Sequence, residues 1–233
     1  MCTNFAFIFL SHCEGTSVMS KSSSVFYKVP PDAGKCRGVV LAFHGGCFIG
    51  GNAGWDVAQN RLLAKMGYAV WQLAFPKTWT AWKVWAAKFD WTVLEARGVP
   101  VHCIGRSSGG YLARAFDRMH PGKISKLLLL CPVVNPALRA KLLPKFEAKT
   151  LGFFGTTEEV VVMPALWEQD EDDSREDRVM LMLAHQDRNV PDELFNTVEI
   201  RRAVYPGPAS HTGVLGCVSK VFAQTVYEFL VKS

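Results

Sequence analysis

Short apolar runs alternate along the chain with longer segments of helical periodicity. Gly38–Phe43 (GVVLAF) is a continuous run rich in β-branched residues that ends at glycines, a pattern typical of a strand buried on both faces. Similar runs predict further strands. These lie at Val25–Val29, Tyr68–Leu73, Val99–Ile104, Ile124–Cys131, Val179–Ala184 and Val198–Tyr205.

Apolar residues spaced by three and four positions predict helices between these strands. In Thr80–Ala96, the residues Trp82, Trp85, Phe89 and Val93 fall on one helical face. Further helices are expected at Trp55–Met66, Ser108–His120 and Leu215–Val231. Buried strands separated by helices indicate an α/β fold, with a mostly parallel central sheet flanked by helices on both faces.

The pattern is less regular at two places. Between residues 135 and 178 it loosens into a stretch that could form a small lid and a loop excursion, with the acidic run Gln169–Asp177 as a solvated loop. Near the start, Phe5–Leu10 is apolar but too short to span a membrane, and it lacks the flanks of a signal peptide. We therefore expect residues 1–24 to be a flexible leader and residues 25–233 to be a single domain.

Composition and charge narrow the classes of function. The 233 residues are 49% hydrophobic and 20% charged, which is globular, and the net charge of +5 is spread without a dense basic run. No nucleic-acid partner and no stable membrane anchor are therefore expected. The seven cysteines show no CxxC pair and no zinc spacing, so neither a metal nor another cofactor is expected. An odd number without a disulfide framework favours a reducing, cytoplasmic location.

Two adjacent serines lie among glycines in the segment Gly105–Gly109 (GRSSG). A predicted strand precedes this segment and a predicted helix follows it, which is the setting of a nucleophile elbow, where a sharp bend exposes a reactive serine. Ser107 has glycines two positions away on either side and is the predicted nucleophile. Ser108 does not have this spacing, and its N–H at the helix start would instead donate to a developing oxyanion. The phosphate-binding alternatives GxxxxGK[ST] and GxGxxG do not occur.

A serine nucleophile needs a base and an orienting carboxylate, expected in loops after later strands. Asp187 follows the strand Val179–Ala184, and His211 follows the last predicted strand. The alternatives are a turn-forming aspartate and an ordinary loop histidine. Asp192 is a rival acid, weakened by the proline before it and by an expected helix-capping role.

The first buried strand runs into a glycine-rich stretch beginning His44-Gly45-Gly46-Cys47. Small residues there let backbone N–H groups face a reacting centre without a Cβ in the way. Gly45, Gly46, Cys47 and Ser108 are therefore the candidate donors of an oxyanion hole.

With these motifs in this order, the chain resembles the α/β-hydrolase superfamily, especially small serine esterases of the hormone-sensitive-lipase and feruloyl-esterase types. The resemblance extends from about Val25 to Val231, and it includes WQLAFP (Trp71–Pro76), similar to the family's YRLAPE, and VYPGPASH (Val204–His211). Three departures stand out. Cys47 replaces the third glycine of the HGGG motif, the segment after Asp187 is short, and the cap is minimal.

The resemblance implies a serine hydrolase that cleaves carboxylic esters through an acyl-enzyme, with Ser107 as nucleophile, His211 as base and Asp187 as orienting acid. The partner would be a small-molecule ester. The sequence leaves open which ester this is and what the oligomeric state of the protein is. An amide or peptide hydrolase with the same triad, or a non-catalytic binding protein on the same fold, are the alternatives. Four aromatic residues could line the pocket or pack in the core: Phe48, Trp55, Trp79 and Phe154.

Overall fold

The structure is a computed structural model that describes residues 25–31, 35–156, 178–196, 202–204 and 210–231. The expected leader at residues 1–24, the acidic run and most of the last predicted strand lie outside the described residues.

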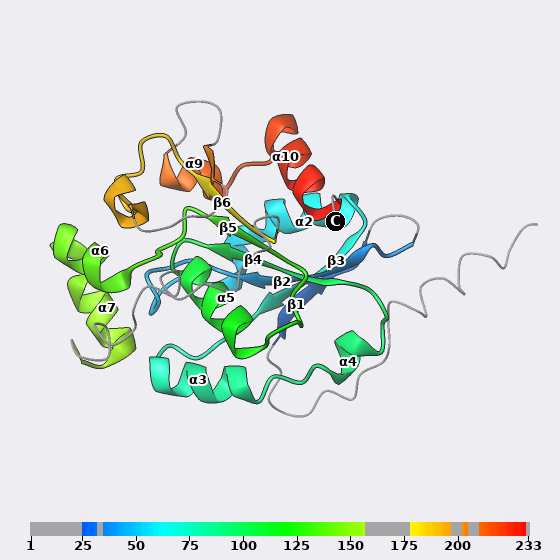
Figure 1. The fold of residues 1–233 in the computed structure, drawn as a ribbon, viewed down its shortest axis with the longest axis horizontal. Helices are drawn as coiled ribbons and strands as arrows, with labels where there is room; N and C mark the ends of the chain where they lie inside the picture. Colours follow the sequence, from blue (N-terminus) through cyan, green and yellow to red (C-terminus); the bar gives the residue numbers. More distant parts are fainter. Residues whose placement is uncertain (1–24, 32–34, 157–177, 197–201, 205–209, 232–233) are drawn as a thin grey trace, which may run out of the picture.

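The described strands form one sheet of seven, in the order β1-β3-β2-β4-β5-β6-β7 (Figure 1). The first strand, β1, pairs antiparallel with β3, and every other neighbouring pair is parallel. The mostly parallel sheet predicted from the sequence is thus confirmed. The bounds are β1 Val25–Val29, β2 Gly38–Phe43, β3 Tyr68–Leu73, β4 Val101–Arg106, β5 Lys126–Leu130, β6 Val179–Leu183 and β7 Arg202–Val204.

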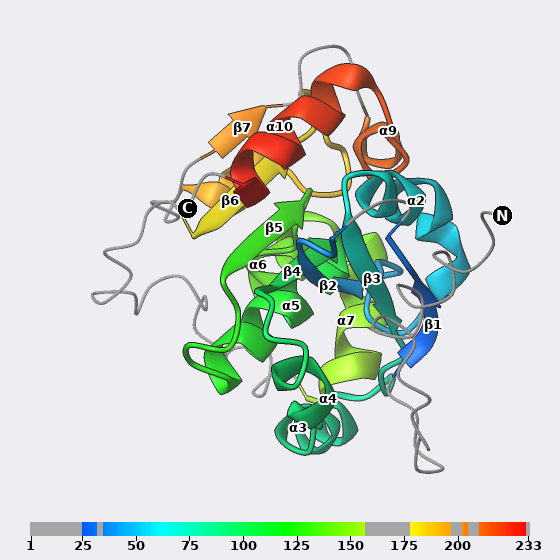
Figure 2. The same ribbon diagram turned by 90° about the vertical axis from the view of Figure 1, so that its right-hand side faces the viewer.

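Helices cover both faces of this sheet (Figures 1 and 2). On one face lie α3 (Trp79–Ala87), α4 (Thr92–Glu95) and α5 (Ser108–Met119), and on the other lie α2 (Val57–Lys65) and α10 (Lys220–Val231). Alternate side chains of a strand point to opposite faces. In β2, accordingly, Leu41 belongs to the α5-side core and Val40 to the α10-side core.

Shorter elements gather near the carboxyl ends of the parallel strands, on the left in Figure 1. They are α6 (Pro136–Leu142), the 3₁₀ turn η2 (Pro144–Phe146), α7 (Glu147–Phe154) and α9 (His211–Leu215). The first three fall in the predicted lid region, of which residues 157–177 lie outside the described part.

Three predicted helices are divided by local capping that the periodicity did not reveal. The helix expected at Thr80–Ala96 ends at Ala87, and α4 begins after Asp90, whose side chain accepts a hydrogen bond from Thr92 N. The helix expected at Leu215–Val231 is interrupted at Gly216. The second part, α10, begins after Ser219, whose Oγ accepts a hydrogen bond from Phe222 N. The helix expected at Trp55–Met66 opens as a 3₁₀ turn, η1 (Ala53–Asp56), capped by Asn52.

One strand is shifted towards the site. The sequence predicts Val99–Ile104, whereas β4 runs from Val101 to Arg106, because Gly105 and Arg106 still pair with Phe43 and Leu130 in the neighbouring strands. The strand therefore reaches directly to Ser107.

Candidate active site

Ser107 lies on a sharp bend between β4 and α5. Its φ of 52° and ψ of −123° are strained for a non-glycine residue, and its N–H donates to Leu130 O at 2.9 Å. The flanking glycines permit the bend. A Cβ on Gly105 would lie 2.6 Å from Gly110 Cα, and one on Gly109 would lie 2.4 Å from His44 O. The strand, the helix and the loop after β2 can meet only because these side chains are absent.

The structure brings Ser107, His211 and Asp187 into one hydrogen-bonded chain. His211 Nε2 lies 3.0 Å from Ser107 Oγ, and His211 Nδ1 lies 2.6 Å from Asp187 Oδ2. With the proton on Nδ1, the imidazole donates to the carboxylate, and Nε2 can accept the serine proton. This arrangement can activate a hydroxyl for attack on a carbonyl carbon.

Asp187 is held by its own loop. Its Oδ1 accepts from Asn189 N at 2.8 Å and from Val190 N at 2.9 Å, which leaves Oδ2 for His211. Asp192 is exposed as the first residue of the 3₁₀ turn η3 (Asp192–Phe195). The capping role expected for it is wrong, because Pro191 occupies the cap position and no side chain caps this turn.

The loop after β2 lies directly against Ser107. A Cβ on Gly45 would be 3.1 Å from Ser107 Cβ, so a larger residue would press against Ser107. Three further residues adopt positive φ angles: Gly46 at 124°, Cys47 at 53° and Phe48 at 70°. Within the described residues, no partner is found for the N–H groups of Gly46 and Cys47, so they are available to an anion.

Ser108 has a contact that the sequence did not suggest. Its Oγ accepts a hydrogen bond from Phe48 N at 3.0 Å and so links the start of α5 to the loop after β2. The side chain of Ser108 therefore holds the loop after β2 in place. Its own N–H lies at the start of α5, as expected.

His44 stabilises the same loop. Its Nδ1 lies 2.7 Å from Gly45 O, and its ring stacks on Phe75 with the centroids 4.5 Å apart. Burial lowers the pKa of His44 to about 4, with a smaller opposing effect from the Gly45 carbonyl and further lowering by Lys77 and Arg106. A neutral His44 can donate to Gly45 O without adding charge to the loop beside Ser107.

Cys131, the last residue of a predicted strand, lies next to Asp187 and His211. It has a φ of 43°, and its Sγ, an Asp187 oxygen and a His211 nitrogen all lie within 4.8 Å of one another. These ligand types could hold a metal ion. However, burial and the neighbouring Asp187 raise the pKa of the Cys131 thiol, and Asp187 and His211 are already bonded to each other. The geometry therefore favours a protonated thiol beside the carboxylate.

A pocket of about 410 Å³ opens beside His211. Residues with polar side chains, from the segments around Asp187 and His211, line it: Gln186, Arg188, Asn189, Ser210, His211 and Thr212. Of the aromatic residues considered for the pocket, Phe48, Trp79 and Phe154 are instead buried in the core, and the side chain of Trp55 lies outside the described part. Phe48 stacks on Phe153 with the ring centroids 5.1 Å apart, and this contact packs α7 against the loop after β2.

No family model matches the sequence, and no curated protein matches it. Solved structures, however, superpose over most of the chain. The Francisella virulence factor BioJ matches with a TM-score of 0.65 and 15% identity, over 88% of this chain and 80% of that one. Carboxyl esterase 2 from the fungus Tuber melanosporum matches with a TM-score of 0.62 and 16% identity, over 92% and 89%. Monoglyceride lipase from Saccharomyces cerevisiae matches with a TM-score of 0.60 and 15% identity, over 88% and 90%.

The chain has the α/β-hydrolase fold. In this fold, Ser107, Asp187 and His211 follow β4, β6 and β7, in that order along the chain. At these low identities the similarity establishes the fold, and the activity has to be argued from the site. None of the described helices is long and apolar enough to cross a bilayer.

Proposed function

We propose that this protein is a serine hydrolase that cleaves carboxylic esters through Ser107, His211 and Asp187. The observation that carries the proposal is the pair of distances at His211, 3.0 Å to Ser107 Oγ and 2.6 Å to Asp187 Oδ2. Small-molecule esters are the proposed partners. Two of the superposed structures are named as an esterase and a lipase, which supports an ester rather than an amide.

The proposed reaction follows from this geometry. His211 Nε2 takes the proton of Ser107 as Oγ bonds to the carbonyl carbon, and the N–H groups of Gly46, Cys47 and Ser108 stabilise the negative oxygen of the tetrahedral intermediate. When the intermediate collapses, the C–O bond to the alcohol breaks and His211 returns its proton to the departing oxygen. Water then attacks the acyl-enzyme by the same steps and releases the acid.

A cytoplasmic location is part of the proposal. None of the five described cysteines is in a disulfide, which supports a reducing compartment.

The test combines labelling with turnover. The wild-type protein should react covalently with a fluorophosphonate and should hydrolyse a 4-nitrophenyl ester, whereas Ser107→Ala should do neither. A folded wild-type protein that neither labels nor turns over any ester would indicate the binding-protein alternative. Faster cleavage of a matched 4-nitroanilide than of the ester would indicate the amidase alternative.

A further inference from the structure

A buried guanidinium lies across the carboxyl ends of the central strands. Arg139, on α6, is 1% exposed. Its Nε donates to Asn189 O at 2.9 Å, and its Nη2 lies 3.8 Å from Cys47 Sγ. Cys47 follows β2 and Asn189 follows β6, while β4 and β5 lie between those strands in the sheet. A side chain that contacts both loops therefore spans the sheet edge where Ser107 lies.

The charge of Arg139 is not matched by a carboxylate in the described part of the chain. Its guanidinium lies over the Phe146 ring at 3.7 Å, and its Nη1 is buried without a hydrogen-bond partner among the described residues. Asp187 is close enough to act on it electrostatically, but the oxygens of Asp187 are already engaged by two backbone N–H groups and His211. Burying a cation with an unpaired N–H costs free energy of folding unless an anion accepts that hydrogen bond and balances the charge.

A backbone contact connects Ser107 to the segment that leads into α6, the helix that carries Arg139. Ser107 O accepts from Val133 N at 3.1 Å, and α6 begins three residues later with its cap on Asn135. Resting on the proposed function, we propose that Arg139 forms an anion subsite, so that the substrate is an ester carrying a second, negatively charged group such as a carboxylate. The charged group would be bound by the fork of Arg139 while Ser107 attacks the ester carbonyl.

Two matched ester pairs test this subsite on both sides of the scissile bond. One pair is the 4-nitrophenyl monoester of adipic acid and the same molecule with its carboxylate methylated. The other is 4-acetoxybenzoate and its methyl ester. In at least one pair, the wild-type kcat/KM should favour the anionic member by about 10-fold to 100-fold, as expected for a charge-assisted hydrogen bond.

Arg139→Met should abolish this preference, and Arg139→Lys should keep part of it, with folding of both variants checked by circular dichroism. Lys145→Met is the matched control, because exposed Lys145 also lies over the Phe146 ring, at 4.9 Å, and carries the same charge. It should leave the preference unchanged. The subsite is overturned if neither pair shows a preference, or if the preference survives in Arg139→Met. Activity on the neutral esters would persist under either of these outcomes. The proposed ester hydrolysis is therefore tested independently of the anion subsite.

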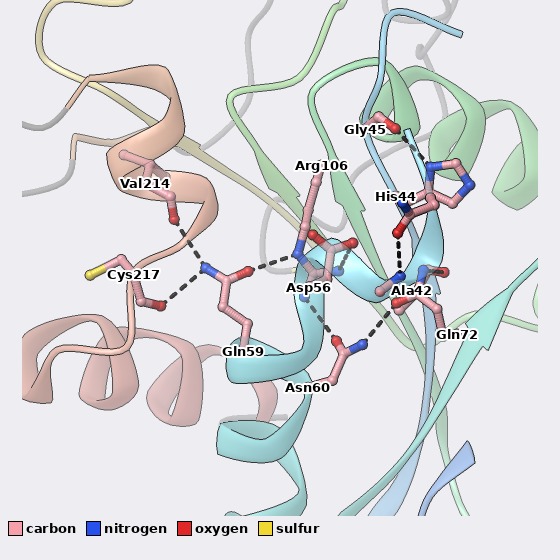
Figure 3. A network of polar contacts seen from close by, with 12 residues as sticks. Ala42, His44, Gly45, Asp56, Gln59, Asn60, Gln72, Arg106, Val214 and Cys217 are labelled. Carbon is pink, nitrogen blue, oxygen red and sulfur yellow. Dashed lines mark hydrogen bonds and ion pairs between the residues drawn. The ribbon is translucent and has the colours of Figure 1, made fainter. Parts of the chain in front are cut away.

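A second, independent observation concerns Gln59, which connects the nucleophile strand to the histidine helix. Figure 3 shows Gln59 between Arg106 and the carbonyl groups at the end of α9. Arg106 Nε donates to Gln59 Oε1 at 2.7 Å, and Gln59 Nε2 donates to Val214 O at 3.0 Å and Cys217 O at 3.1 Å. Arg106 precedes Ser107, and His211 is the first residue of α9.

The geometry points to Gln59 as a positioning residue that fixes the distance between Ser107 and His211. It is 1% exposed and uses both ends of its amide, so it can hold α9 in only one position relative to β4. Its neighbour Asn60 provides a matched comparison. Asn60 is fully buried, accepts from the same Arg106 at 3.0 Å, and donates to Gln72 Oε1 at 2.8 Å, so these two bonds join β4 to β3.

Comparing Gln59→Met with Asn60→Leu distinguishes an effect on the position of His211 from an effect on stability. A third variant, Gln59→Glu, keeps the acceptor for Arg106 and removes the donor to α9. We expect both Gln59 variants to lower kcat and the rate of fluorophosphonate labelling by about 10-fold to 100-fold with KM unchanged, as for a misaligned reacting group. Asn60→Leu should lower Tm to a similar extent without this loss. Equal losses of kcat in Gln59 and Asn60 variants of equal Tm would overturn the assignment. Wild-type labelling and turnover test the proposed function separately.

Discussion

At the scale of single residues, identical side chains in adjacent positions have different environments. Ser107 Oγ faces His211 Nε2, while Ser108 Oγ accepts from Phe48 N. One hydroxyl is therefore available for chemistry, and the other is used to hold a loop.

Ser107→Ala should abolish hydrolysis of an activated aryl ester, because among the described residues only the Ser107 hydroxyl is bonded to His211. Ser108→Ala should leave a substantial part of kcat, and it should lower the free energy of unfolding by about 1–3 kcal/mol because Phe48 N loses its partner. Turnover and chemical denaturation of both variants measure this. Complete loss of turnover in a folded Ser108→Ala protein would contradict the assignment.

The two candidate acids can be separated in the same way. Asp187→Asn should reduce kcat by a factor on the order of a thousand or more, because an amide no longer holds His211 in the productive tautomer. Asp192→Asn is the control and should be close to wild type, since Asp192 is exposed. The opposite ranking in steady-state kinetics would reverse the assignment.

At the scale of elements, the site depends on how closely the strand, the helix and the loop approach one another. Gly109 is one example, since the carbonyl of His44 in the loop after β2 occupies the space that a Cβ would need. Substitution there affects three elements together.

Gly109→Ala should destabilise the fold by about 3 kcal/mol or more and eliminate turnover, because backbone atoms would have to move. Gly152→Ala is the matched control. Gly152 lies inside α7 with only ordinary contacts to Ile49, so alanine should be neutral or stabilising by about 0.5–1 kcal/mol. Thermal unfolding of the two variants measures this difference in stability. A Gly109→Ala protein as stable as wild type would contradict the expectation and show that the loop after β2 can move to make room for the methyl group.

At the scale of the whole molecule, two buried histidines couple stability to pH. Burial lowers the pKa of His44 and of His102 to about 4, and Lys126 adds to the effect on His102. A histidine whose folded pKa is depressed stabilises the fold fully above its unfolded pKa near 6.5, and it loses that contribution as pH falls towards 4.

We therefore expect the free energy of unfolding to fall between pH 6.5 and pH 4, by about 2–3 kcal/mol for each of these two histidines. His102→Gln should make the free energy of unfolding fall less steeply as the pH decreases over this range. His185→Gln, at an exposed loop position, is the control and should not. Urea denaturation over this pH range measures the slope, and an identical slope in His102→Gln and wild type would contradict the expectation.

The sequence by itself determined the sheet and the chemical groups of the candidate site. Strand β2 and the elbow at Ser107 could be predicted because they depend on neighbouring residues, through side-chain alternation and through glycines that permit a bend. The breaks at Lys88–Trp91 and at 216–219 were missed because single side-chain caps, which leave hydrophobic periodicity unchanged, set them.

Only the tertiary structure decided which residues act together. Asp187 and Asp192 occur in the same loop, and the choice between them rests on a 2.6 Å contact with a residue 24 positions away. Arg106, Arg139 and Cys131 carried no distinguishing signal in the sequence, because their roles depend on contacts between the carboxyl ends of strands far apart in the chain. Local pattern fixes the secondary structure and the available chemistry. Burial and partner choice are set by long-range packing, which no local pattern records.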